Sequence, residues 1–285
     1  MIKRFNKKFL IKFLLTILTF YVVYCKIDLK QVIETFSQIK FQYIIVAFIS
    51  LLLAQVMSSY RMKYYYSTAN VNCSNSFSIK LFFVSMFYNI IFPGGIGGDG
   101  YKIYIMSKLY QLPKLTSLKL ALANRFNGLA ALILLLGLFS IFADFSNCYI
   151  KNYIIIMSLL CFFGYFIMAK FILKEHLKIA FTAMKYSFTI QLLGIIAAGL
   201  LFYGFENNIP SMNYFIVFLI SSILSILPIS IGGAGIREVS FIYGAKYLNV
   251  DPAIGVAFSF TYFLINFILS LAGSMFVNKI KSELS

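Results

Sequence analysis

The sequence predicts an all-α integral membrane protein with about six full transmembrane helices plus two re-entrant or broken helical hairpins in an inverted repeat. Of its 285 residues, 61% are hydrophobic and only 12% are charged. A chain of this composition has more apolar surface than the core of a water-soluble protein of this length can enclose. The apolar residues come in long blocks, and a glycine-rich pattern occurs twice between them. We therefore expect a single polytopic membrane domain over residues 1–285, without a soluble domain.

Six apolar blocks are long enough to be full crossings. The first, Phe9–Cys25, follows a basic N-terminus like a secretory signal, but the residues before Cys25 lack the small side chains of a cleavage site, so we expect a retained helix. The others can span a hydrocarbon core of about 30 Å at about 1.5 Å per residue. They are Phe41–Tyr60, Leu118–Phe142, Tyr153–Ala169, Phe188–Phe205 and Ala253–Val277.

Two further apolar blocks, Ile79–Phe92 and Tyr214–Leu227, are too short to cross, because each would reach only about 21 Å as a helix. A proline follows each block, and a second short helix is expected beyond the glycine pattern, near Tyr101–Tyr110 and Ile236–Leu248. This length is typical of re-entrant segments. The alternative is a pair of ordinary spans kinked at the two prolines.

The distribution of charge favours the hairpins. The chain has 25 Lys and Arg residues and a formal net charge of +16. If both short blocks turn back, most basic residues, Arg61 among them, lie on the side of the N-terminus, which the positive-inside rule makes cytoplasmic. The two hairpins then enter from opposite sides, so the halves around residues 79–142 and 214–277 form an inverted repeat, as in alternating-access carriers. Membrane topology and lipid phosphates account for the charge, so no nucleic-acid partner is expected.

The glycine pattern predicts an anion site in each half. Pro93–Lys102 reads PGGIGGDGYK, and Pro228–Arg237 reads PISIGGAGIR. A helix that begins after a Gly-Gly turn presents free backbone N–H groups and the positive end of its dipole. Lys102 or Arg237 adds a cation to each copy, and the planar fork of arginine suits phosphate oxygens. The expected ligand is therefore a phosphate or carboxylate group.

Arg125 lies within an apolar block, where an arginine costs on the order of 2.5 to 3.5 kcal/mol on insertion scales and needs a partner or a wet cavity. Asp99 and Glu238 are the acids placed to supply one. The alternative is that these charges only tie the hairpins together. Asn89, Asn124, Asn127 and Asn266 are expected to add hydrogen bonds in the same cavity. The predicted substrate-binding residues are Pro93, Gly97, Gly98, Asp99, Gly100, Lys102, Arg125, Pro228, Gly232, Gly233, Gly235, Arg237 and Glu238.

Signatures of enzymes are missing from the sequence. It has no paired-carboxylate motif, no nucleophile elbow and no phosphate-binding loop of the ATPase type. Its 4 cysteines are scattered, which indicates neither a zinc site nor a disulfide framework. We expect no catalytic residue, no metal and no cofactor. Tyr64, Tyr65 and Tyr66, beside Arg61, predict an aromatic belt at the membrane interface rather than a site.

At these motifs the chain resembles the flippase-like family that shares the transmembrane region of lysylphosphatidylglycerol synthase. The resemblance covers most of the chain and is carried by Asn89–Lys102, by Asn124 with Arg125, and by Leu227–Glu238. It implies a multi-pass protein of the bacterial inner (cytoplasmic) membrane, with a cytoplasmic N-terminus. Such a protein would move an anionic phospholipid or a polyprenyl-phosphate-linked glycan between leaflets, in envelope lipid or polysaccharide biogenesis.

The sequence departs from the family in two places. Asn124 stands where members often carry an acid, and Thr261–Leu264 offers no arginine where many members have one. These differences bear on the identity of the headgroup more than on the fold. The soluble aminoacyl-transfer domain of the synthase is missing, so we do not expect synthesis of lysylphosphatidylglycerol.

Three other functions remain open from the sequence. One is a non-catalytic membrane subunit that supports a glycosyltransferase or lipid synthase, in which case envelope-biosynthesis enzymes are the partners. The second is a membrane-embedded transferase that uses one of the few embedded acids as a base. The third is a carrier of small anions. Four measurements distinguish these functions from lipid transport. Lipid translocation supports a lipid carrier, partner co-purification an accessory subunit, product formation a transferase, and ion flux a carrier of small anions.

Overall fold

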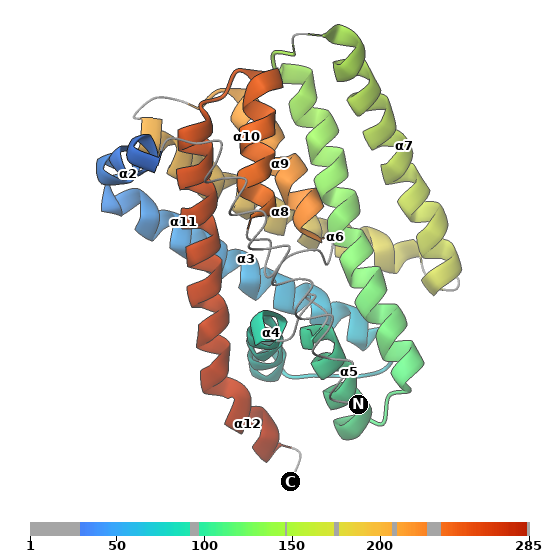
Figure 1. The fold of residues 1–285 in the computed structure, drawn as a ribbon. Coiled ribbons are helices and arrows are strands. Elements are labelled where there is room, and N and C mark those ends of the chain that lie inside the picture. The colour runs from blue at the N-terminus through green and yellow to red at the C-terminus, as the bar shows by residue number, and fades with distance from the viewer. Residues whose placement is uncertain are drawn as a thin grey trace, which may run out of the picture.

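In the computed structural model, the chain is helical throughout the described parts, which are residues 29–91, 97–145, 147–173, 177–206, 210–226 and 235–283. Figure 1 shows the arrangement of the helices. They are α2 (Leu29–Gln38), α3 (Phe41–Ser67), α4 (Asn75–Ile91), α5 (Gly97–Leu109), α6 (Lys114–Phe142), α7 (Cys148–Leu173), α8 (Leu177–Glu206), α9 (Met212–Ile226), α10 (Ile236–Leu248), α11 (Pro252–Leu271), the 3-10 helix η1 (Ala272–Phe276) and α12 (Val277–Ser282).

Within the described residues, 5 helical segments are long and apolar enough to cross a membrane. They are Phe41–Ser67, Lys114–Phe142, Cys148–Phe171, Lys178–Phe205 and Pro252–Ser282. Each coincides with one of the crossings predicted from the sequence, and the remaining predicted crossing, Phe9–Cys25, lies outside the described residues. The chain is therefore an all-helical, multi-pass membrane protein.

The last crossing is built from three consecutive elements, α11, η1 and α12. Its start is specified locally, because the Asp251 carboxylate accepts a hydrogen bond of 2.7 Å from the Ala253 N–H and Pro252 occupies the first turn. In Figure 1 this segment runs from the upper to the lower end of the bundle.

Besides α2, four helices are shorter than the crossings and lie in two consecutive pairs. The α4–α5 pair lies at the lower end of the bundle in Figure 1, and the α9–α10 pair lies in its upper half. Helix α5 leads to the end where α6 begins, and α10 leads to the opposite end, where α11 begins. With 13 residues each, α5 and α10 are about 20 Å long, which is less than a hydrocarbon core of about 30 Å.

The α9–α10 pair packs against α8 and α11 through aromatic rings. Phe202 of α8 stacks on Phe258 of α11, with ring centroids 4.0 Å apart. Phe241 of α10 and Phe218 of α9 both meet Phe258 edge-on, at 5.5 and 5.7 Å. Phe202, Phe241 and Phe258 are fully buried. This packing holds α10 against α11, with Gly235 and Arg237 at the start of α10.

The predicted aromatic belt is wrong for two of its three tyrosines. Tyr65 and Tyr66 are only 1% and 2% exposed, and the Tyr66 hydroxyl lies 3.1 Å from the Ser117 hydroxyl of α6. Helix α3 continues past the predicted end of the crossing to Ser67, because neither Pro nor Gly interrupts it. Tyr65 and Tyr66 in its last turns therefore face neighbouring helices and not lipid headgroups.

Candidate functional site

The first candidate site is a three-residue charge cluster at the start of α5. Asp99 Oδ1 lies 2.6 Å from Lys102 Nζ, and Asp99 Oδ2 lies 2.5 Å from Arg125 Nε on α6. The side chains of Asp99 and Lys102 are 13% and 8% exposed, whereas that of Arg125 is 33% exposed. One carboxylate therefore neutralises one of two cations, and the cluster carries one net positive charge next to the positive end of a helix.

Close contact between α4 and α5 positions this cluster. The Gly98 N–H donates a 2.8 Å hydrogen bond to Asn89 Oδ1, which satisfies one of the free amides in the first turn of α5. Gly98 is buried against the backbone of Ser85, so that a Cβ atom at this position would lie 2.0 Å from the Ser85 carbonyl oxygen. Only glycine allows this approach, whereas Gly100 is exposed and has nothing within 4 Å of an added Cβ.

We expect Gly98→Ala to destabilise the protein and Gly100→Ala not to. Alanine is favoured over glycine in a helix by roughly 0.8–1.0 kcal/mol, so the same change without a clash should be neutral or stabilising. At Gly98 the clash with Ser85 forces α5 away from α4, and overpacking of this kind costs about 1–3 kcal/mol or more. Thermal unfolding of the purified variants in detergent measures the difference. Equal melting temperatures for the two variants would contradict the close contact.

The second candidate site begins at Gly235, which precedes α10. Its backbone φ of 84° is in the region that favours glycine. The Gly235 N–H donates a 2.8 Å hydrogen bond to Glu238 Oε2, and Glu238 is only 2% exposed. The carboxylate therefore caps the helix and complements its dipole. Glu238 is not the partner of Arg125, since Asp99 takes that position.

Arg237 is held by aromatic rings rather than by an acid. Its guanidinium carbon lies 4.4 Å from the ring centroid of Tyr262 and 5.4 Å from that of Phe218, in the geometry of cation–π contacts. Among the described residues it forms no ion pair, and its buried Nη1 atom has no hydrogen-bond partner there. A guanidinium with an unused donor is available to an anion.

Arg237 faces a polar cavity of about 290 Å³ between α8, α9, α10 and α11. The residues that line it are Gln191, Phe218, Ser222, Arg237, Glu238, Ser259, Tyr262, Phe263 and Asn266. The hydroxyl of Ser259 is a second buried polar atom without a partner in the described part of the chain. Because buried polar groups are nearly always paired, two unpaired donors on one cavity indicate a ligand or ordered water.

The comparison with known proteins assigns the chain to a family. Residues 9–183 and 166–273 match the family described as the lysylphosphatidylglycerol synthase TM region. The chain belongs to this family. No curated protein and no solved structure matches it. The resemblance drawn from the glycine patterns is thereby confirmed.

The residues that sequence reasoning selected for this family member fall into separate groups. Gly97, Gly98, Asp99, Gly100, Lys102 and Arg125 lie at or beside the start of α5, and Gly235, Arg237 and Glu238 lie at the start of α10. Pro93, Pro228, Gly232 and Gly233 lie outside the described residues. The described residues contain no group of acids, histidines and cysteines that could hold a metal ion.

The four asparagines predicted to share one cavity do not do so. Asn266 lines the polar cavity, and its Oδ1 accepts a 3.2 Å hydrogen bond from Gln55 of α3. Asn89 holds Gly98, and Asn127 bonds to Ser187 and to Tyr165. Asn124 is buried, without a partner for Oδ1 in the described residues. The four asparagines come from three different helices, α4, α6 and α11, and therefore meet different neighbours.

Sequence reasoning missed four cavity residues, Gln191, Ser222, Ser259 and Tyr262. A signal was present for α11, because Ser259, Tyr262 and Asn266 are spaced as i, i+3 and i+7 and so share one helical face. Gln191 and Ser222 are single polar residues in apolar blocks. Nothing in their local sequence indicates which neighbour they meet.

Arg61, which the sequence only placed on the cytoplasmic side, is half-buried and makes contacts that the sequence did not predict. Its Nη1 donates a 2.6 Å hydrogen bond to the Ser187 hydroxyl, which in turn bonds to Asn127. Gly128 lies next to the guanidinium, since an added Cβ there would be 3.1 Å from Arg61 Nη1. Neutral acceptors thus hold this cation between α3, α6 and α8.

Proposed function

We propose that the protein translocates an anionic lipid between the leaflets of the bacterial cytoplasmic membrane, in the biogenesis of envelope lipids or polysaccharides. The proposal rests on the surroundings of Arg237. Its guanidinium has an unused buried donor, makes no ion pair among the described residues, and faces a polar cavity inside a helical membrane protein. Membership of the lysylphosphatidylglycerol synthase TM region family supports a role in lipid biogenesis.

The chemistry of the cavity favours an anionic headgroup. Arg237 supplies a fork that matches phosphate oxygens, and the side chains of Gln191, Ser222 and Ser259 supply neutral hydrogen-bonding groups. The acid on the cavity, Glu238, is engaged by the Gly235 N–H. The ammonium of a zwitterionic headgroup would therefore meet Arg237 beside a carboxylate that already accepts a hydrogen bond, so it gains less from this cavity than a purely anionic headgroup does.

The size of the cavity favours a small headgroup. Its volume of about 290 Å³ is near the lower end of ligand sites, about 300 Å³. A phosphate with a glycerol-sized substituent fits such a space better than a long glycan does. We therefore place an anionic phospholipid first and a polyprenyl-phosphate-linked glycan second as the transported lipid.

We further propose that α4–α5 and α9–α10 are re-entrant hairpins related by an inverted repeat. Three observations support this arrangement. Helices α5, α9 and α10, with 13, 15 and 13 residues, are too short for ordinary crossings, the pairs lie toward opposite ends of the bundle, and α5 and α10 lead to opposite ends (Figure 1). In an alternating-access cycle, the charge cluster around Asp99 would receive the headgroup from one side of the membrane, and Arg237 would receive it from the other.

Purified wild-type protein in liposomes tests the function directly. We expect it to move fluorescent phosphatidylglycerol between leaflets, and to move phosphatidylcholine much more slowly because its choline would face Arg237. Accessibility of the fluorophore to a membrane-impermeant quencher reports the movement. Co-purification of a glycosyltransferase or lipid synthase without lipid movement would instead support an accessory subunit. Ion flux or product formation without lipid movement would likewise reject the proposal.

A further inference from the structure

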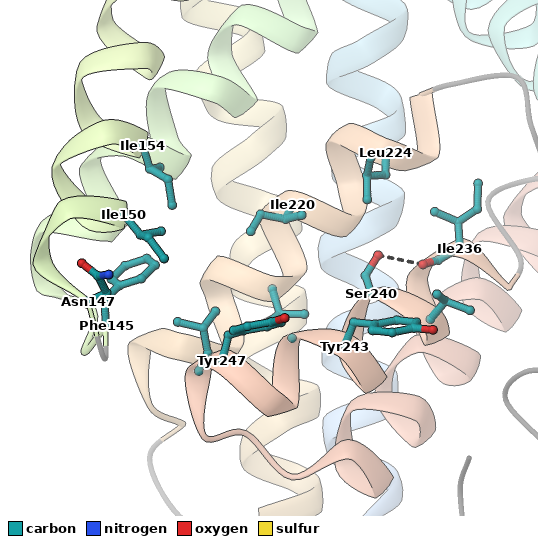
Figure 2. A pocket seen from close by; sticks show the side chains of 14 residues that line it. Phe145, Asn147, Ile150, Ile154, Ile220, Leu224, Ile236, Ser240, Tyr243 and Tyr247 are labelled. Atoms are coloured by element: carbon teal, nitrogen blue, oxygen red, sulfur yellow. Dashed lines mark hydrogen bonds between the residues drawn. The ribbon is translucent and has the colours of Figure 1, made fainter. Parts of the chain in front are cut away.

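A second cavity lies on the other side of the α9–α10 pair, where this pair faces α7. It has a volume of about 560 Å³ and is lined almost entirely by apolar atoms. Figure 2 shows the lining side chains, which come from both sides of the space. They include Ile150 and Ile154 of α7, Ile220 and Leu224 of α9, and Val239 and Tyr247 of α10. We call this cavity the α7 groove.

The α9–α10 pair separates the α7 groove from the polar cavity. On α10, Ile236 and Val239 line the groove, whereas Arg237 and Glu238 line the polar cavity. On α9, Ile220 lines the groove and Ser222 lines the polar cavity. The pair therefore has one face for hydrocarbon and one face for polar groups, as a lipid has two chemically different ends.

Two of the polar groups at the groove are hydrogen-bonded within the protein. Ser240 Oγ donates a 2.7 Å hydrogen bond to the Ile236 carbonyl, drawn as a dashed line in Figure 2. Asn147 Oδ1 accepts a 2.8 Å hydrogen bond from the Tyr149 N–H. The groove thus offers little hydrogen bonding to an occupant, and hydrocarbon suits it.

Membrane hydrocarbon is the medium around this face. Helix α7 is a crossing, and only 17% of its most apolar stretch is buried. Its side chains Tyr153, Leu160 and Phe163 are 65%, 60% and 62% exposed. A helix from a partner protein is a poor fit, because a cylinder of about 10 Å diameter would fill the volume in roughly 7 Å of its length. A single extended acyl chain is thinner and fits a long groove.

A cation lies beside the tyrosine end of the groove. Lys246 is exposed in the last turn of α10, and its Nζ is 6.0 Å from the ring centroid of Tyr247, which lines the groove. A lysine at the membrane surface attracts lipid phosphate. A phospholipid carries its phosphate next to its acyl chains, so a single molecule with one chain in the groove places its phosphate near Lys246.

We propose that the α7 groove binds one acyl chain of a phospholipid whose phosphate lies beside Lys246. This inference deepens the proposed function, because a lipid held there lies next to the helix pair that carries Arg237. It identifies the face at which the lipid enters or leaves the polar cavity.

Photo-crosslinking tests the groove in the full chain. Nanodiscs would contain phosphatidylglycerol with a diazirine in one acyl chain, and mass spectrometry would locate the adducts. We expect adducts to concentrate on Ile150 and Ile154 of α7 and on α10. Ile150→Trp fills the groove with a larger side chain and should abolish the adducts on α10. Leu160→Trp on the exposed surface of the same helix is the matched control and should leave them unchanged.

Three results would overturn the inference, and a fourth would reject only the proposed function. Equal labelling of Ile150, Leu160 and Phe163, unaffected by Ile150→Trp, would mean that only bulk lipid contacts this face. Crosslinking to a co-purified polypeptide in place of lipid would mean that a protein occupies the groove. Labelled groove residues in a protein that moves no lipid would reject the proposed function alone. Lipid movement that is insensitive to Ile150→Trp, without specific labelling, would reject the groove alone.

Discussion

Asp99→Asn is expected to destabilise the protein by about 3–5 kcal/mol, the cost of breaking a buried ion pair by removal of one partner. The two oxygens of the Asp99 carboxylate each contact a different cation, Lys102 and Arg125. Asparagine keeps the size of the side chain but removes its charge, so both cations lose this carboxylate at once. Lys102 is 8% exposed and cannot regain hydration without moving. The melting temperature of the purified variant in detergent measures the loss.

Asp251→Asn is the matched control for this prediction. Asp251 caps α11 through its side chain, and asparagine is an equally good N-cap, so the same chemical change should have little effect there. Adding Lys102→Met to Asp99→Asn removes one stranded cation and should recover part of the lost stability. If Asp99→Asn and Asp251→Asn melt at the same temperature, the charge cluster does not stabilise the fold.

Arg237→Gln is expected to remove selective translocation of anionic lipid. Hydrogen bonds to charged groups contribute about 1.5–3 kcal/mol, so headgroup binding should weaken by roughly 10-fold to 150-fold. Glutamine lacks both the charge and the planar fork that lies against Tyr262 and Phe218. Arg237→Lys retains the charge without the fork and should keep part of the activity. Lipid movement in liposomes and binding of phosphatidylglycerol by native mass spectrometry are the measurements.

Lys178→Gln removes an exposed cation from α8 and serves as the control for loss of charge. It should leave lipid movement unchanged. The double change of Arg237 and Lys102 to glutamine should abolish movement completely, but Lys102 is also paired with Asp99, so the melting temperature must be measured beside it. Undiminished transport in a folded Arg237→Gln variant would reject the assignment of Arg237 to headgroup binding.

Most of the helical architecture was predictable from the sequence. The interval Ile236–Leu248 was expected as a helix and is α10, because a glycine turn precedes it and apolar residues fill it. The crossings were found from the length of apolar blocks, since a membrane requires about 20 apolar residues in a helix. Their ends were less certain. Helix α3 extends to Ser67, because polar and aromatic residues after Tyr60 do not stop a helix that remains packed.

The candidate site was predictable only in part. The glycine pattern before Arg237 predicts it as a site residue, but no local pattern predicts its contact with Tyr262. Asp99 was correctly chosen as an acid near Arg125, whereas Glu238 has a local role at Gly235. The spacing of Glu238 three residues after Gly235 resembles a capping box, which is a local signal.

The amino-acid sequence was enough to predict a helical membrane protein, the positions of most of its helices along the chain, and its family. These properties depend on the length, hydrophobicity and motifs of continuous segments. The three-dimensional packing was needed to show that Asp99 pairs with two cations, that Arg61 bonds to a neutral hydroxyl, and that Arg237 faces a polar cavity. These contacts join residues distant in sequence, and which helical faces meet depends on the packing of the whole bundle.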